Sequence, residues 1–256
     1  MEIQWFGTAS IKITEGNTAI LFDPFISMNP QVQHTSIEDY TGITDIFITH
    51  GHFDHILNVY DVWKLNKSTI YCSTQVADVL LRQGISVQDI RIINHGQVVS
   101  IPPLIVKIYK GEHIHFDFHL IIKTLFSVRI LKNFDKFLQL LSLNKKMPMG
   151  NVFAYEIINQ DKNILHFGSL NYSAHTEYPY KPSMLTLPFQ GRDDITTYAI
   201  EFVKKFMPHT LFVHHFDDTF PPLSSNVETA KFIEEITRLF PDISVILPQY
   251  GISYMV

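Results

Sequence analysis

The 256-residue chain has a single cysteine, Cys72, and no apolar run that approaches the length of a membrane-spanning helix. One cysteine excludes a framework of internal disulfides and is compatible with a reducing compartment. The first residues enter a strand-like pattern at once and lack the charged and then apolar segments of an export signal. We therefore expect a cytoplasmic protein without a transmembrane segment.

Positive charge is also scarce, since 20 lysines and arginines face 25 acidic residues and leave a net charge of −5. An acidic chain argues against general affinity for nucleic acid. Residues 121–150 depart from this balance because they hold one acid, Asp135, and six basic residues: Lys123, Arg129, Lys132, Lys136, Lys145 and Lys146. The other 14 basic and 24 acidic residues carry −10.

Short strand-like and helix-like segments alternate along the whole chain. Residues 2–25 predict antiparallel strands joined by a hairpin turn at 15–17. Helices are expected at 57–67, 74–83, 196–206 and, capped by Ser225, up to Leu239. Strands are expected at 69–72, 89–93, 97–101, 104–109, 152–158, 164–167, 184–188, 210–213 and 244–247. Two sets of strands, each followed by helices, predict one layered α/β domain spanning residues 1–256.

Residues 119–146 interrupt the strand pattern, with apolar residues near helical spacing and lysines and asparagines between them. We expect one or two amphipathic helices inserted between sheet strands. Three explanations of this segment remain open. It is an ordinary solvated helix, a contact between two copies of the chain, or a basic surface that attracts anions or lies on a membrane.

Three histidines and one aspartate fall within the six residues His50-Gly51-His52-Phe53-Asp54-His55, directly after the apolar run 46–49. Because alternate residues of extended chain point the same way, His50 and His52 converge on one point. Asp54 and His55, beyond the turn, can face a second point nearby. Imidazole and carboxylate suit zinc, manganese or iron. A histidine-rich turn without a metal is the alternative, but four ligands at this spacing are much rarer than one.

This stretch matches the HxHxDH signature of the metallo-β-lactamase superfamily. Further segments resemble that superfamily in the same order along the chain: 5–10, 20–25, 111–113, 167–169 and 214–218. The resemblance implies a four-layer αββα sandwich of two mixed sheets flanked by helices, with a helical insertion at about 119–146. It places the metal site along one edge of the two sheets.

The resemblance also implies the metal ligands. The first site would be formed by His50, His52 and His113, and the second by Asp54, His55 and His215. Neighbouring histidines remain alternatives, namely His115 or His119 for His113 and His214 for His215. One or two divalent ions are expected, zinc first, with manganese or iron as alternatives.

Two further positions follow from the resemblance. Asp23 would orient a ligand histidine, unless it is merely a turn carboxylate before Pro24. Ser169 stands where the family usually has an aspartate that bridges the two metals. A neutral hydroxyl is a weaker ligand, so we expect a second ion that binds less tightly. Filling of the gap by Asn171 or water, and loss of activity, are the alternatives.

These ligands predict a metal-dependent hydrolase that activates water for attack on an ester, lactone or phosphodiester, with Asp54 as proton acceptor. A degenerate family member that binds metal or ligand without turnover is the alternative, suggested by Ser169. The expected substrate is a small molecule, anionic if the basic segment borders the site. His175 and Arg192 are candidate substrate contacts, and a homo-oligomer is left open.

Overall fold

Alternating apolar residues and tight turns divide the first 22 residues into three antiparallel strands, β1 (Glu2–Trp5), β2 (Ile11–Glu15) and β3 (Thr18–Phe22). The computed structural model describes residues 1–32, 34–115 and 118–256, without the side chains of 118, 119, 121 and 123. The side chains of the candidate ligand His119 and of the basic residue Lys123 therefore lie outside the described part. Gly16 sits in the β2–β3 turn at φ 59°, a conformation that glycine adopts without strain.

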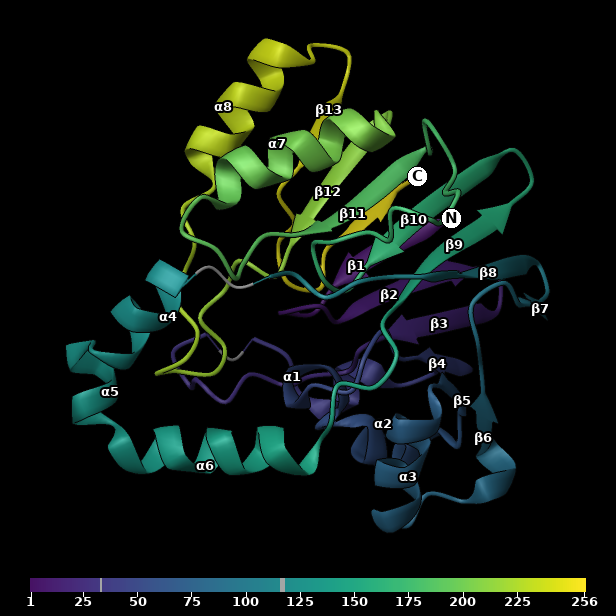
Figure 1. Ribbon diagram of the computed structural model, residues 1–256. Coiled ribbons are helices and arrows are strands. Elements are labelled where there is room, and N and C mark those ends of the chain that lie inside the picture. Colours follow the sequence, from purple (N-terminus) through teal and green to yellow (C-terminus); the bar gives the residue numbers. More distant parts are fainter. Residues whose placement is uncertain (33, 116–117) are drawn as a thin grey trace.

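Two mixed sheets of seven strands each are formed by the described residues (Figure 1). The first has the order β14-β1-β2-β3-β4-β5-β6, where β4 is Asp45–Phe47, β5 Thr69–Cys72, β6 Ile90–Ile92 and β14 Ser253–Met255. The second has the order β13-β12-β11-β10-β9-β8-β7. Its strands are β7 (Val98–Ile101), β8 (Leu104–Lys110), β9 (Phe153–Asn159), β10 (Lys162–Phe167), β11 (Met184–Pro188), β12 (Thr210–His214) and β13 (Ser244–Ile246).

Three apolar layers separate four layers of secondary structure. Between the sheets, side chains such as Trp5, Phe22 and Phe47 meet Tyr155 and Phe212. The outer face of the first sheet is covered by α1 (Phe53–Ile56), α2 (Val59–Asn66) and α3 (Thr74–Arg82). The outer face of the second sheet is covered by α7 (Ile195–Phe206) and α8 (Ala230–Leu239). Short 3₁₀ turns lie at Ile37–Tyr40 and Val87–Asp89. The αββα sandwich is thereby confirmed.

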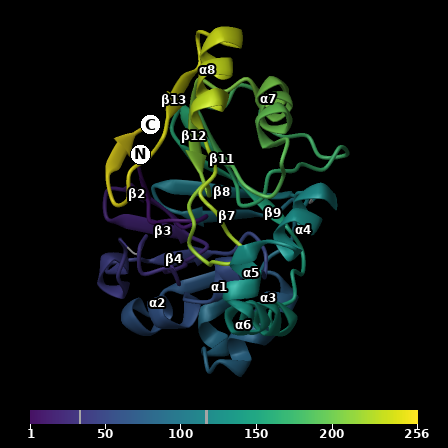
Figure 2. The same ribbon diagram turned by 90° about the vertical axis from the view of Figure 1, so that its left-hand side faces the viewer.

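The insertion contains three helices where one or two were expected: α4 (Phe118–Leu125), α5 (Val128–Lys132) and α6 (Phe134–Lys146). Ser127 starts α5 by accepting a hydrogen bond from the Ile130 backbone nitrogen, and Asn133 leaves helical geometry at φ −128°. The three helices line the left-hand side of Figure 1, which faces the viewer in Figure 2. No helix among the described residues is both long and apolar enough to cross a bilayer.

Two expectations about the C-terminal part were wrong. The last helix begins at Ala230, not after Ser225, because the preceding segment pairs with the loop after β12. In that pairing the Val227 backbone nitrogen donates to the Phe216 carbonyl at 2.8 Å. The sheet pattern also does not end at 247, since β14 returns to pair with β1, bringing Tyr254 opposite Ile3.

Candidate metal centre

Five strand ends deliver the candidate residues to one region. Asp23 follows β3 and His50 follows β4, and these two strands are parallel in the first sheet. In the second sheet His113, Ser169 and His215 follow β8, β10 and β12. These three strands run in one direction, because β9 is antiparallel to β8 and β10 and because β10, β11 and β12 are parallel. Parallel strands end at the same edge, so residues far apart in sequence meet there.

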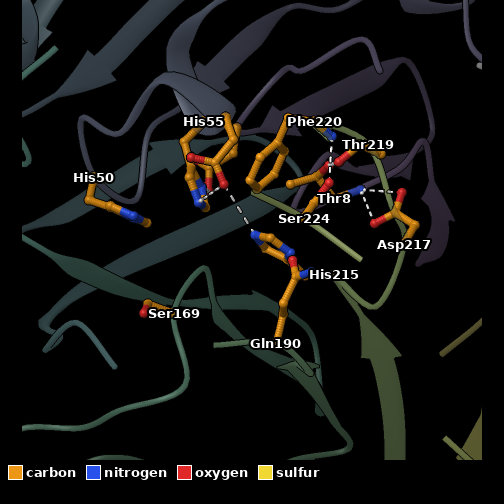
Figure 3. A network of polar contacts seen from close by, with 12 residues as sticks. Thr8, His50, His55, Ser169, Gln190, His215, Asp217, Thr219, Phe220 and Ser224 are labelled. Carbon is orange, nitrogen blue, oxygen red and sulfur yellow. Dashed lines mark hydrogen bonds and ion pairs between the residues drawn. The ribbon is translucent and has the colours of Figure 1, made fainter. Parts of the chain in front are cut away.

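Two groups of ligand atoms form at this edge, each with its members within 4.8 Å of one another. The first cluster consists of His50, His52 and His113, and the second of Asp54, His55 and His215. The two adjoin, since the ring centroids of His50 and His55 are 3.9 Å apart. Figure 3 shows His50, His55 and His215 around one space. The described structure therefore brings together the six residues that the sequence pointed to.

Asp23 belongs to neither cluster and instead holds one of its members. Its Oδ2 accepts a hydrogen bond from His55 Nδ1 at 2.8 Å and another from the Thr49 hydroxyl at 2.5 Å. Its Oδ1 accepts from the Thr49 backbone nitrogen at 2.7 Å. Asp23 sits at φ 45°, a left-handed conformation that costs a non-glycine residue free energy and recurs at functional sites. Its carboxylate thus fixes the orientation of the His55 ring.

The protons in the hydrogen-bonded chain from Asp23 through Thr49 to His50, here called the Asp23–Thr49 relay, can be placed by starting from groups that only accept hydrogen bonds. An ionised carboxylate cannot donate, so the Thr49 hydroxyl donates to Asp23 and its oxygen accepts from His50 Nδ1, 3.0 Å away. His113 Nδ1 likewise donates to the Ile114 carbonyl at 2.9 Å. Each of these imidazoles, and His55, then directs the lone pair of Nε2 to the cluster. Thr49 was missed from sequence, where it appeared only as the end of a strand.

Burial sets the charge of most of these groups. It lowers the pKa of His50 far below the usual value, helped by the neighbouring histidines, and lowers the pKa of His113 to about 4. Burial also opposes ionisation of Asp54, but His55 and His215 outweigh it, so the pKa of this carboxyl lies below its usual range. The imidazoles of His50 and His113 are thus neutral beside the ionised Asp54 carboxylate, which is the state that binds a cation.

His55 differs, because burial is outweighed there by Asp23 and Asp54, which raise its pKa. A proton and a metal ion therefore compete for the same nitrogen, Nε2, which lies 3.6 Å from Asp54 Oδ2.

An orphaned atom shows that the donor set suits an ion. His50 Nε2 is buried and has no hydrogen-bond partner among the described residues. Buried polar atoms are rarely left unpaired, and a cation in the first cluster would satisfy this one. His215 faces Asp54 Oδ2 with its Nε2, at 3.3 Å. Imidazole nitrogens with one carboxylate match zinc, manganese or iron. The residues present fit one or two divalent ions.

His215 is positioned by the loop that follows it. The residue itself has φ 57°, and Asp217, two positions on, accepts hydrogen bonds from the Thr8 backbone nitrogen and from Tyr250 Oη. The hydroxyls of Thr8 and Thr219 are 2.8 Å apart (Figure 3). These contacts tie the second sheet's ligand loop to the first turn of the first sheet. Sequence analysis gave Thr8 and Tyr250 no role.

The alternative histidines lie elsewhere. His214 is fully buried, with its two ring nitrogens 3.3 Å from the Thr8 carbonyl and 3.2 Å from the Phe167 carbonyl. His115 is exposed, and its carbonyl accepts a hydrogen bond from Arg192 at 2.8 Å. Neither belongs to the clusters found among the described residues.

The candidate substrate contacts are less closely tied to this centre. Arg192 forms an ion pair with Asp194 at 2.5 Å, in addition to its bond to the His115 carbonyl. His175 lines a surface hollow beside His95 and Lys107. Among the described residues, no hydrogen bond or ring contact joins His175 to either cluster. Both assignments therefore remain predictions.

Ser169 supports the loop that carries His113. Its hydroxyl accepts a hydrogen bond from the Ile114 backbone nitrogen at 2.9 Å. Asn171 donates to the His113 carbonyl at 3.1 Å, and its side-chain oxygen accepts from the Tyr172 nitrogen. The amide of Asn171 is thus engaged with backbone, which argues against its filling the place of a bridging ligand.

Two glycines allow the close contacts around the ligands. A Cβ on Gly168 would lie 2.1 Å from Thr49 Oγ1, so only glycine lets this strand end approach the Asp23–Thr49 relay. A Cβ on Gly51 would lie 2.2 Å from the Pro148 carbonyl oxygen, and the Gly51 nitrogen donates to the Met149 carbonyl at 2.7 Å. The end of the insertion therefore packs directly on the loop between His50 and His52.

A family profile described as "Beta-lactamase superfamily domain" matches residues 18–197. A UPF0173 metal-dependent hydrolase of Methanopyrus kandleri is 22% identical over 258 residues, covering 99% of each chain. Another, from Chelativorans sp., is 31% identical over 100 residues, and this match spans 39% of the chain and 43% of the relative.

Solved structures resemble the same architecture. Igni18, a metallo hydrolase of Ignicoccus hospitalis, superimposes with a TM-score of 0.67 at 17% identity, over 100% of this chain and 98% of the other. Zn²⁺-bound PqqB of Methylobacterium extorquens superimposes with a TM-score of 0.55 at 13% identity, over 96% and 87% of the two chains. At these identities the likeness concerns the fold.

Proposed function

This chain belongs to the metallo-β-lactamase superfamily, and on that premise we propose that it is a metal-dependent hydrolase of an ester, lactone or phosphodiester bond. The observation that carries the proposal is the pair of adjoining ligand clusters, in which His50, His55 and His113 are held with the lone pairs of Nε2 directed inward. The full-length similarity to a metal-dependent hydrolase supports the same reaction class.

The residues of the centre would have three different functions: binding metal, accepting a proton and orienting the metal ligands. The six clustered side chains would hold one or two divalent ions, which when bound supply a Lewis acid that lowers the pKa of water and polarises the scissile bond. Asp54 is ionised, so it can accept a proton from the attacking water. Asp23 and Thr49 keep the protons of His55 and His50 on Nδ1, away from the centre.

We propose zinc as the resident metal, with a second ion that is held less tightly because Ser169 supplies no bridging carboxylate. Support comes from the imidazole-rich donor set and from the zinc-bound PqqB among the similar folds. We also propose a cytoplasmic location, because Cys72 is the single cysteine and forms no disulfide. Burial raises the pKa of its thiol to about 12, which keeps it protonated.

The test begins with protein stripped by a chelator and reconstituted separately with zinc, manganese or ferrous iron. Hydrolysis of 4-nitrophenyl acetate, an N-acyl homoserine lactone and bis(4-nitrophenyl) phosphate is then measured, with His50→Ala as the control that removes a ligand. We expect turnover of at least one substrate that requires the metal and is lost in the control. Turnover that survives both the chelator and His50→Ala would refute the proposal.

The second candidate is a degenerate member that binds metal without turnover, and Ser169 favours it. The same experiment separates the two candidates when the bound metal is counted by elemental analysis. Stoichiometric metal with no hydrolysis of any substrate class would support the degenerate member.

A further inference from the structure

The helical insertion presents apolar side chains to solvent on its outer side. Phe126 is 81% exposed and Leu131 is 72% exposed. We call this surface the outer apolar face and define it by Phe126, Val128, Leu131, Phe134, Leu138 and Leu141. Scattered single apolar residues on a surface are ordinary, but these six all fall within residues 126–141, and apolar surface gathered in one part of a protein marks an interaction site.

Helix α6 shows that this face is separate from the core. Phe137, Leu140 and Met147 are buried, and Leu140 and Met147 pack in the apolar layer of the first sheet. Phe134, Leu138 and Leu141 follow the i, i+4, i+7 spacing of a second stripe, and all three are exposed. A surface helix that contacts only its own protein has polar residues at such positions. The outer stripe is therefore unexplained by the fold.

Lysines accompany the outer apolar face. Lys132 lies one turn beyond Val128 on α5, and Lys145 lies one turn beyond Leu141 on α6, so each shares the exposed side of its helix. Neither forms an ion pair with an acid of the described chain. Lys136 and Lys146 are exposed as well. A long lysine side chain can extend its ammonium group past neighbouring apolar residues toward an anion.

We propose that the outer apolar face docks onto the surface of an anionic phospholipid bilayer. Phosphate headgroups would receive the lysines, while the phenylalanine and leucine side chains enter the boundary between headgroups and acyl chains. A second copy of the chain fits less well, because a twofold contact through this face would gather the lysines of both copies in one interface. Protein interfaces are moreover depleted of lysine.

The insertion is firmly attached to the candidate metal centre, so docking would fix the position of that centre relative to the lipid. Arg129 on α5 forms an ion pair with Asp218 at 2.7 Å and donates to the Ser224 carbonyl at 3.0 Å, in the loop that follows His215. At the other end, the Met149 carbonyl accepts the hydrogen bond from Gly51. The helices lie along one side of the molecule (Figure 2).

The experiment is vesicle co-sedimentation of the full chain, in chelator and again with zinc, so that its outcome does not depend on turnover. Vesicles of phosphatidylcholine alone are compared with vesicles of equal parts phosphatidylcholine and phosphatidylglycerol. We expect binding to the anionic vesicles that weakens as salt is raised. Lys132→Gln with Lys145→Gln should weaken binding about twenty- to thirtyfold, or about fivefold for each lysine.

Leu131→Ser with Phe134→Ser should also abolish most of the binding, because it removes the apolar contact. Val98→Ser with Met255→Ser is the matched control, since these exposed apolar residues lie on edge strands outside the insertion, and it should bind like the wild type. Unchanged thermal unfolding of each variant verifies its fold. The proposal is overturned if the wild type ignores anionic vesicles, or if sedimentation equilibrium shows a dimer that Leu131→Ser with Phe134→Ser dissociates without vesicle binding.

Discussion

Asp23→Asn tests whether one carboxylate sets the protons of both clusters. The Asp23 carboxylate accepts three hydrogen bonds, from the Thr49 nitrogen at 2.7 Å, the Thr49 hydroxyl at 2.5 Å and His55 Nδ1 at 2.8 Å. Asparagine has one accepting oxygen and one donating NH₂ group. If its oxygen keeps the Thr49 nitrogen, its NH₂ group faces the Thr49 hydroxyl and His55. His55 Nδ1 must then accept, and the Thr49 hydroxyl must donate to His50 Nδ1.

Both imidazoles would thereby carry their proton on Nε2, the nitrogen that faces the clusters. A ligating nitrogen must be free of its proton, and changing a group that orients a metal ligand typically costs 10- to 100-fold in affinity, or about 1.4–2.7 kcal/mol. Because His50 and His55 belong to different clusters, we expect losses of this size at both. Weaker charge-assisted hydrogen bonds should also lower the unfolding free energy in chelator by about 1.5–3 kcal/mol.

The affinity is measured by zinc titration against a competing chelator, and the proton positions by nitrogen chemical shifts of the histidine rings. Thr49→Val is the matched variant, because it interrupts the connection to His50 and leaves the Asp23–His55 bond in place. It should weaken the first cluster only. The reasoning fails if Asp23→Asn binds zinc as the wild type does, or if Thr49→Val weakens the second cluster as much as the first.

Three further variants probe the surroundings of the centre. Gly168→Ala should lower the unfolding free energy in chelator by about 3 kcal/mol, because its Cβ would meet Thr49 Oγ1 at 2.1 Å. Gly16→Ala, whose Cβ has nothing within 4 Å, should cost only the strain of alanine at a positive φ, about 1–2 kcal/mol. His166 is fully buried, and its pKa is lowered to about 3, mainly by burial and in addition by the charge of nearby His55. Between pH 6.5 and 3 this histidine therefore binds a proton in the unfolded chain but not in the folded one. Relative to His166→Gln, the wild type should lose about 1.4 kcal/mol of unfolding free energy per pH unit on acidification below 6.5, measured by urea unfolding; parallel curves would contradict this. Ser169→Asp should raise the occupancy of the second ion in elemental analysis, whereas Ser169→Asn should not.

Much of the centre could be anticipated because its ligands occur in local patterns. The His50–His55 stretch places four of the six clustered residues within one turn after a strand, and strand ends account for His113 and His215. Thr49 could not be recognised in the same way. Its function depends on Asp23, which is 26 residues away and is brought to it by the parallel pairing of β3 and β4.

Sequence patterns did not predict which side of a helix is buried, or where a helix begins, when packing against the rest of the protein decides between two sides or two starting points. In α6, Phe137 and Leu138 are neighbouring apolar residues, yet the first is buried and the second exposed. Periodicity shows that apolar residues occupy two sides of this helix but not which side the sheet layer covers. The start of α8 was misplaced for a similar reason, because Ser225 is a good capping residue whose segment instead pairs with the loop after His215.

Ser169 changes the charge of the centre as well as its donor count. The six clustered residues include one carboxylate, Asp54, while Asp23 is engaged with Thr49 and His55. Two divalent ions together with the Asp54 and Asp23 carboxylates would leave two positive charges here, against one if position 169 were an aspartate. A unit charge at about 4 Å is worth about 4 kcal/mol at an effective dielectric constant near 20. The same serine that loosens the second ion should therefore favour anionic substrates, and Ser169→Asp should lower kcat/KM for bis(4-nitrophenyl) phosphate relative to that for 4-nitrophenyl acetate.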